Sequence, residues 1–274
     1  MTTTRTPAAN RFQPIDPQPD DAPPMPNHTD KTLARIRTEL LTTFSAADWE
    51  SYNHLVGWLR DTDVASQALK AGDTAPDFLL PDADGRLHSS EQLRRNGPLV
   101  LSFFRGGWCP FCTAELCALQ AAKDMFESVG ATLAVVTPET RDFPRQLKRS
   151  LGLNLKVLSD VDYGVAMSYG VLFRVPDETK AHYSGLGFDF GARHGSPVWM
   201  LPIPATYVID AEGRIRSAFV EPDFTIREEP AQILASLRQA ASISWLEGSA
   251  IQRQDHESRT RQGSEQTTTF SLVI

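Results

Sequence analysis

The chain has 274 residues, of which 41% are hydrophobic, so it can bury a sizeable core in one large domain or two small ones. Its net charge of -7 gives no general attraction to nucleic acid or to anionic membranes, and we expect neither as a partner. No apolar run reaches the roughly 18 residues of a membrane span, and the first residues lack the apolar core of a secretory signal, which favours a cytoplasmic location.

The two ends of the chain contain few large apolar residues. Residues 1–28 are rich in proline and threonine, and residues 246–274 are rich in glutamine, serine and threonine. Such compositions bury too little apolar surface to offset the entropy that ordering costs. We therefore predict a disordered N-terminal segment and a flexible C-terminal tail.

Residues 29–70 show the spacing of a helical extension. Apolar residues recur three or four positions apart in two runs, first at Leu33, Ile36, Leu40 and Leu41, and then at Tyr52, Leu55, Val56 and Leu59. Ser45 followed by Asp48 is typical of the start of the second helix. We expect this helical pair to pack on the core or on a second subunit.

Residues 71–245 alternate between strand and helix patterns. The predicted elements in chain order are a hairpin over 78–87, a short helix capped by Ser89 or Ser90, a strand over 99–104, a helix over 110–129, a strand over 131–136, a helix over 143–151, a strand over 155–158, a helix over 161–171, a strand over 202–210, an antiparallel strand over 215–220 and a last helix from Pro230 to about Ala241. This order predicts an α/β fold with a mixed, mostly parallel central sheet and helices on both faces.

The stretch over 172–201 is too long for an ordinary connection inside a compact domain. It carries the aromatic residues Phe173, Tyr183, Phe188, Phe190 and Trp199. These side chains suit either a wall over a functional site or a homodimer contact. A self-packed surface loop is the alternative.

All three cysteines lie within nine residues, where the strand over 99–104 gives way to the helix over 110–129. Pro110 is favoured at the first helical position, which makes Cys109 the N-cap and places Cys112 in the first turn. The positive end of the helix dipole stabilises a thiolate, the reactive form of cysteine. Cysteines this close together cannot crosslink distant parts of a fold, so we predict that they are redox-active.

Residues near the cysteines leave alternatives open. Cys117 is either a third redox cysteine or a small buried apolar residue, and Arg105 either lowers the pKa of a nearby thiol or is a solvated loop charge. Nothing in the sequence places a histidine near the sulfurs, so we expect surface positions for His28, His54, His88, His182, His194 and His256. The chain has no second pair of closely spaced Cys or His residues, and we expect no metal and no other cofactor.

The stretch from Cys112 to Cys117, C-T-A-E-L-C, resembles the C-T-x-x-x-C run of the atypical two-cysteine peroxiredoxins related to bacterioferritin comigratory protein. Gly72–Phe78 resembles the G-x-x-A-P-x-F opening of the same superfamily. The resemblance covers residues 71–245 and implies a thioredoxin-like fold. It also implies that Cys112 attacks peroxide and that Cys117 resolves the product.

The sequence departs from this family pattern at three positions. Aligned on Cys112, the family's proline falls on Arg105 and its threonine on Cys109, while the arginine expected two residues before Thr206–Asp210 falls on Pro204. The missing threonine and arginine favour a thiol-disulfide oxidoreductase.

A thioredoxin-like pattern stands in place of the missing residues. Trp108–Cys112 resembles W-C-x-x-C, and Ile203–Thr206 resembles the cis-proline segment that faces this motif. The resemblance implies that the substrate contacts Trp108, Pro110, Pro204 and Thr206.

The family resemblance implies a thioredoxin-dependent peroxidase that reduces hydrogen peroxide or alkyl hydroperoxides. The reaction passes through a cysteine sulfenic acid and an intramolecular disulfide, and thioredoxin or a similar dithiol is the reducing partner. The alternative is a thioredoxin-like thiol-disulfide oxidoreductase, in which Cys109 attacks a substrate disulfide and Cys112 resolves the mixed disulfide. A redox sensor without enzymatic activity is the third interpretation.

Helix geometry separates the two disulfides that these cysteines could form. Along an intact helix, the Cα atoms of Cys112 and Cys117 would be roughly 8 to 9 Å apart, whereas a disulfide tolerates at most about 6.8 Å. The Cα atoms of Cys109 and Cys112 would be roughly 5 to 5.5 Å apart. We therefore predict that oxidation joins Cys109 to Cys112.

Overall fold

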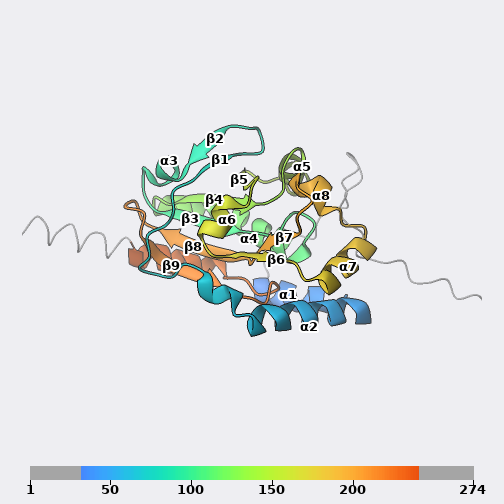
Figure 1. Ribbon diagram of the computed structural model, residues 1–274. Helices are drawn as coiled ribbons and strands as arrows, with labels where there is room; N and C mark the ends of the chain where they lie inside the picture. The colour runs from blue at the N-terminus through green and yellow to red at the C-terminus, as the bar shows by residue number, and fades with distance from the viewer. Residues whose placement is uncertain (1–31, 241–274) are drawn as a thin grey trace, which may run out of the picture.

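The computed structural model describes residues 32–240 (Figure 1). The predicted disordered segment over 1–28 and the predicted tail over 246–274 lie outside these residues. Within the described range, no helix is long and apolar enough to cross a membrane.

A mixed sheet of five strands forms the centre of the molecule (Figure 1). The strands in spatial order are β5 (Lys156–Ser159), β4 (Thr132–Thr137), β3 (Leu99–Phe103), β8 (Ala205–Ile209) and β9 (Ile215–Val220). β3 pairs in parallel with β4, and β4 with β5, whereas β8 is antiparallel to both β3 and β9. Every residue of β3 and β8 is buried, as expected for continuous apolar runs in a covered sheet.

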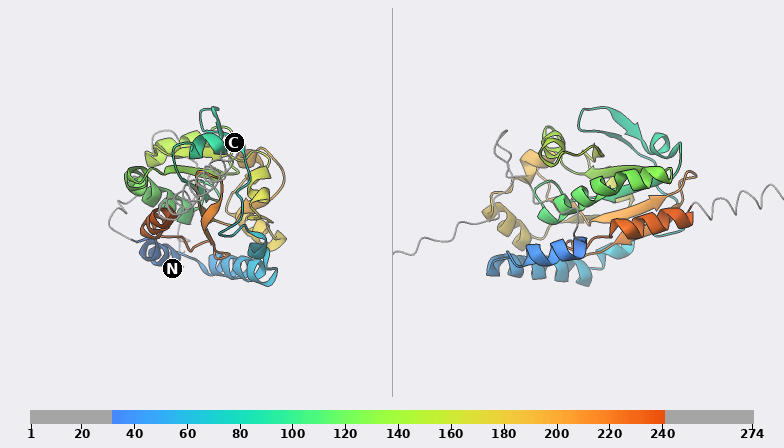
Figure 2. Two further views of the ribbon diagram at one scale, coloured as in Figure 1. Left: turned by 90° about the vertical axis from the view of Figure 1, so that its left-hand side faces the viewer. Right: turned by 180° about the vertical axis from the view of Figure 1, so that it is seen from behind.

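Helices cover both faces of this sheet. α4 (Pro110–Ser128) and the helix over residues 230–240 lie on the face seen from behind in Figure 2. α6 (Gly164–Ser168) and a small antiparallel ribbon of β6 (Leu172–Arg174) and β7 (Met200–Pro202) lie on the opposite face (Figure 1). The predicted α/β architecture is therefore confirmed.

Turn and cap residues place several short elements where the sequence predicts them. β1 (Leu79–Pro81) and β2 (Leu87–Ser89) form the hairpin, and the Ser89 hydroxyl caps α3 (Ser90–Arg94). α5 spans Phe143–Leu151, the range predicted from its helical spacing.

The N-terminal part of the described chain consists of α1 (Leu33–Leu41), α2 (Ala46–Asp61) and the single turn η1 (Val64–Gln67). A capping box at Ser45 starts α2. The Ser45 hydroxyl accepts a hydrogen bond from the Asp48 amide, and the Asp48 carboxylate accepts one from the Ser45 amide. These helices lie along one side of the molecule (Figures 1 and 2). The division of the chain into 29–70 and 71–245 stays a prediction.

Two predicted elements differ from the structure. The helix predicted over 161–171 is shorter than expected, because Tyr163 and Gly170 adopt positive φ angles of 61° and 68° on either side of α6. The single strand predicted over 202–210 is wrong. It divides at residues 203–204 into β7, which pairs with β6, and β8, which joins the central sheet.

The segment over 172–201 is not a loop, because it contains β6, α7 (Asp177–Gly185), α8 (Phe190–His194) and β7. Its aromatic rings pack against Trp108, with ring-centre distances of 5.5, 4.9 and 5.1 Å for Tyr183, Phe188 and Phe190. The segment therefore forms a wall over the loop that follows β3, and the alternative of a self-packed surface loop is wrong.

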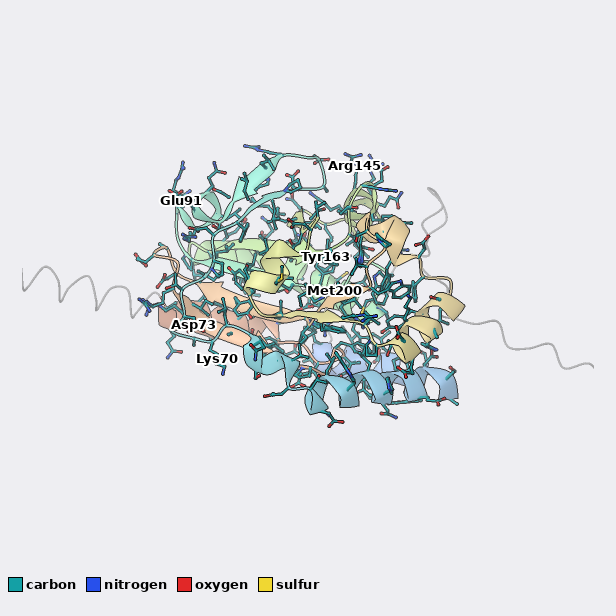
Figure 3. The ribbon with its side chains drawn as sticks, in the orientation of Figure 1. Lys70, Asp73, Glu91, Arg145, Tyr163 and Met200 are labelled. Atoms are coloured by element: carbon teal, nitrogen blue, oxygen red, sulfur yellow. The ribbon has the colours of Figure 1, made fainter. Side chains whose placement is uncertain are left out.

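The N-terminal helices join the core at a tight backbone contact. The amide of Leu69 donates to the carbonyl oxygen of Tyr169 at 3.1 Å. A Cβ added at Gly170 would lie 2.0 Å from the carbonyl oxygen of Gln67 in η1. Lys70 and Asp73 follow at the surface (Figure 3), and the Lys70 amide donates to the Asp73 carboxylate at 2.7 Å.

We expect Gly170→Ala to lower the free energy of unfolding by about 2 to 3 kcal/mol, because alanine is strained at this φ and its Cβ meets backbone. Urea unfolding at one pH measures the change. Gly185→Ala is the matched control, since nothing lies within 4 Å of a Cβ at that position. Equal stability of the two variants would contradict the close contact between η1 and the core.

Candidate active site

The cysteines lie at the carboxyl end of β3 and in α4. Cys109 is the N-cap residue of α4, with φ -92° and ψ 116°, and Pro110 is the first helical residue. Cys112 therefore lies in the first turn of the helix, as the sequence predicts. Cys109, Cys112 and Cys117 are all free thiols.

A buried carboxylate holds the loop between β3 and α4. At Gly106 the φ angle is 147°, and an added Cβ would lie 2.4 Å from the indole Nε1 of Trp108, so glycine is required. The amide of Gly107 donates to the Glu139 carboxylate at 2.7 Å. Glu139 also pairs with Arg193 of α8 at 2.9 Å, which ties the loop to the wall segment.

Two buried arginines face the thiols of Cys109 and Cys112. The two cysteines are 1% and 0% exposed. The Nη2 atom of Arg227 lies 3.2 Å from the Sγ atom of Cys112. The guanidinium of Arg105 adds a second positive charge, which acts on both sulfurs.

The pair of thiols holds one negative charge in these surroundings. Burial raises the pKa of the Cys109 thiol, but the hydrogen bond from Cys112 and the charges of Arg105 and Arg227 lower that pKa to about 6. Burial, with the hydrogen bond and charge of Cys109, raises the pKa of Cys112. The pKa of Cys109 is therefore shifted downward and that of Cys112 upward, and the two arginines favour a thiolate at the dithiol.

Arg105 is 1% exposed, so the expectation of a solvated loop charge is wrong. Its Cζ atom lies 4.8, 5.5 and 4.1 Å from the ring centres of Trp108, Tyr183 and Phe224. Its Nη2 donates to the Tyr183 hydroxyl, whereas its buried Nε has no partner in the described part of the protein. Arg105 thus brings a cation with one unpaired N–H to the site.

Sequence reasoning missed Arg227 and Glu115. Arg227 lies between β9 and the helix over 230–240, and its Nε donates to Oε2 of Glu115 at 2.6 Å. Burial raises the pKa of the Glu115 carboxyl to about 7, against the lowering effect of Arg227. Glu115 follows Cys112 by three residues in α4, and this spacing is the signal that could have found it. No local pattern marks Arg227.

Three of the predicted site residues lie away from the thiol pair or differ from the expected geometry. Cys117 is half-buried farther along α4, and burial raises the pKa of its thiol. The Thr206 hydroxyl donates to the Ser102 hydroxyl, 3.3 Å away across the β3–β8 pairing. No peptide bond between residues 32 and 240 is cis, so the expectation of a cis-proline at Pro204 is wrong.

A pocket of about 50 Å³ opens beside Cys109. A single water molecule needs roughly 10 to 15 Å³ on the same measure. Arg105 and Pro110 line the pocket together with rings from Phe44, Tyr52, Trp108, Phe111, Tyr183 and Phe224. Cys109 also lines it, whereas Cys112 lies behind, so a molecule in the pocket meets Cys109 first.

The prediction that His194 lies at the surface is wrong. It is 1% exposed, its Nδ1 lies 3.1 Å from the Tyr163 hydroxyl, and its ring stacks on Phe190. Burial lowers the pKa of His194 to about 4. His28 and His256 lie outside the described residues. From residue 32 to residue 240, no group of three or more His, Cys, Asp or Glu side chains is arranged to hold a metal ion.

Comparison with known proteins assigns the family. The model of the AhpC/TSA family matches residues 71–218, more than half of the chain. The chain belongs to the AhpC/TSA family. Peroxiredoxin Bcp of Escherichia coli strain K12 is 30% identical over 152 residues, which are 55% of this chain and 85% of that protein. A putative peroxiredoxin of Mycobacterium tuberculosis is 25% identical over 171 residues, 62% of this chain and 97% of that one.

The fold of this AhpC/TSA protein agrees with that of a solved relative. A cysteine mutant of PrxQ from Xylella fastidiosa superposes with a TM-score of 0.51 at 16% identity, over 63% of this chain and 98% of the other. This likeness supports the thioredoxin-like fold alone. The predicted family and fold class are both confirmed.

In this AhpC/TSA protein we expect Arg105→Met to raise the apparent pKa of the Cys109 thiol above about 6, because the variant removes a charge that favours the thiolate. The pH dependence of iodoacetamide alkylation, mapped to Cys109 by mass spectrometry, measures this pKa. Arg145→Met removes a half-exposed charge from α5 and serves as the control. An unchanged titration in Arg105→Met would show that Arg105 does not lower the pKa of the Cys109 thiol.

Proposed function

We propose that this protein is a thiol-dependent peroxidase in which Cys109 and Cys112 form the reacting dithiol. The pocket of about 50 Å³ beside the two buried sulfurs carries the proposal, because a small peroxide fits such a space. Hydrogen peroxide and small alkyl hydroperoxides meet this limit. Membership of the AhpC/TSA family and the similarity to Peroxiredoxin Bcp support the same reaction.

In the first step, the Cys109 thiolate attacks the nearer oxygen of the peroxide. A sulfur–oxygen bond forms, the oxygen–oxygen bond breaks, and the leaving hydroxide or alkoxide takes a proton from solvent to become water or alcohol. The unpaired Nε–H of Arg105, a residue that lines the pocket, stabilises the charge that develops on the leaving oxygen. Cys109 becomes a neutral sulfenic acid.

Loss of the charge on Cys109 activates Cys112 for the second step. The Cys109 thiolate raises the pKa of Cys112, and once Cys109 is neutral, Arg227 at 3.2 Å favours the Cys112 thiolate. This thiolate attacks the Cys109 sulfur, hydroxide leaves as water, and the Cys109–Cys112 disulfide forms. This order differs from the one implied by the family resemblance, in which Cys112 attacks peroxide and Cys117 resolves the product.

An external dithiol returns the enzyme to its starting state. Thiol-disulfide exchange transfers the disulfide to the reductant and restores two thiols. Thioredoxin or a similar dithiol is the partner in this proposal, and the cytoplasm is the compartment that keeps such partners reduced. A homodimer stays a prediction.

Single serine variants test the roles of the cysteines. With hydrogen peroxide in a thioredoxin-coupled assay, we expect Cys109→Ser to fall to the uncatalysed rate, because the attacking thiolate is gone. Cys112→Ser should lose turnover but accumulate a Cys109 sulfenic acid, which dimedone traps for mass spectrometry. Cys117→Ser is the matched control, and it should keep wild-type turnover.

Two results would contradict different parts of this proposal. A dominant Cys112–Cys117 disulfide in the oxidised protein, with dimedone trapped on Cys112, would restore the order of the family resemblance but keep the peroxidase function. A wild type that consumes no peroxide and rapidly reduces insulin disulfides would overturn the function in favour of a thioredoxin-like oxidoreductase.

A further inference from the structure

A turn from Asp223 to Arg227 delivers two side chains to the dithiol. The ring of Phe224 packs on the guanidinium of Arg105, 4.1 Å from its Cζ atom. Arg227 contacts the Sγ atom of Cys112. Residues 223–227 form neither a helix nor a strand, so other contacts must hold Arg227 in place.

Hydrogen bonds inside the turn join Asp223 to Arg227. Oδ1 of Asp223 accepts from the amide and the hydroxyl of Thr225 at 3.0 and 2.6 Å, and its carbonyl oxygen accepts from the Ile226 amide at 2.9 Å. Nη1 of Arg227 donates to the carbonyl oxygens of Phe224 and Ile226. The turn is therefore one unit, and a shift of Asp223 moves Arg227 with it.

The two N-terminal helices hold this unit from outside. Oδ2 of Asp223 accepts from Nη2 of Arg37 in α1 at 3.1 Å and from the Tyr52 hydroxyl in α2 at 2.7 Å. Nε of Arg37 also donates to the Thr225 hydroxyl at 2.7 Å. Although burial raises the pKa of Asp223, the hydrogen bonds from Thr225 and Tyr52 and the charge of Arg37 hold it below its usual value. The anchor is therefore ionised at neutral pH.

We infer that α1 and α2 contribute to the active site, because Arg37 and Tyr52 position Arg227 against Cys112 through Asp223. The inference rests on the proposed function, in which Arg227 favours the Cys112 thiolate in the second step. Arg37 and Tyr52 are positioning residues. The AhpC/TSA family model begins at residue 71, so these helices are an addition to the matched part of the chain.

Apolar packing of α1 and α2 does not account for the polar contacts of Arg37 and Tyr52. Leu33 and Ile36 of α1 pack with Ala114 of α4, and Leu55 and Leu59 of α2 join the main core. These apolar contacts can hold the helices on the molecule. The polar contacts of Arg37 and Tyr52 instead converge on one turn, the turn that carries Arg227.

The titration of the thiols reports the position of Arg227. The ionisable neighbours of the sulfurs come from four elements: Arg105 from the loop after β3, Glu115 from α4, Tyr183 from α7 and Arg227 from the turn. The hydrogen bonds described above join Arg227 to Asp223. Arg37 does not line the pocket beside Cys109, so a change at Arg37 that alters the thiol titration acts through the turn that carries Phe224 and Arg227.

Arg37→Met and Tyr52→Phe test the inference in the full chain. We expect each variant to slow disulfide formation after a peroxide pulse by about ten- to a hundredfold, as small displacements of a catalytic cation do. The midpoint of iodoacetamide alkylation of the dithiol should rise in pH. Arg35→Met, which removes an exposed ion pair with Glu39 from the same helix, is the matched control for Arg37. Tyr163→Phe, which removes a buried hydroxyl hydrogen bond elsewhere, is the control for Tyr52.

The outcomes distinguish positioning from stability. If Arg37→Met and Tyr52→Phe lower the melting temperature but keep the wild-type alkylation midpoint and rate of disulfide formation, α1 and α2 are structural and the inference is wrong. If Arg37→Met fails to fold, Tyr52→Phe still tests the inference, because it removes a single oxygen atom. Arg37→Lys should recover part of the rate of disulfide formation. Alkylation needs no peroxide, so its titration tests the anchor even if the proposed peroxidase function fails.

Discussion

A buried thiolate held against two arginines governs this active site. A thiolate on Cys109 loses most of its hydration, and burial by itself would make ionisation harder. Arg105 and Arg227 offset that cost from two sides. Glu115 pairs with Arg227 at 2.6 Å, so a buried carboxyl group and the thiols share the two cations.

The rest of the structure holds these charges in place. Rings from α2, α4 and the wall segment over 172–201 line the pocket, and apolar surroundings strengthen the charge interactions beside it. The Glu139–Arg193 pair links the wall to the cysteine loop. The thioredoxin-like framework supplies the strand end and the helix start, and other segments supply the cations and the cover.

Substitutions of the family pattern are consistent with this arrangement. Pro204 stands where the family resemblance expects an arginine, and Arg227 contributes a guanidinium to Cys112 from another part of the chain. Cys109 stands where a threonine is expected, so the position that meets the pocket carries a second thiol. With these two changes, the site holds the dithiol of Cys109 and Cys112 between Arg105 and Arg227.

The sequence by itself determined the features that depend on neighbours along the chain. Pro110 marks the start of α4 beside the cysteines, Ser45 and Ser89 mark two further helix starts, and apolar runs mark the strands of the central sheet. Tertiary structure decided which distant groups meet. Arg227 reaches Cys112 across 115 residues, and Tyr183 reaches Arg105 across 78. Whether Arg105 and His194 are solvated or buried was likewise settled by the segments that fold over them, because the burial of a polar side chain depends on its spatial neighbours rather than on its sequence neighbours.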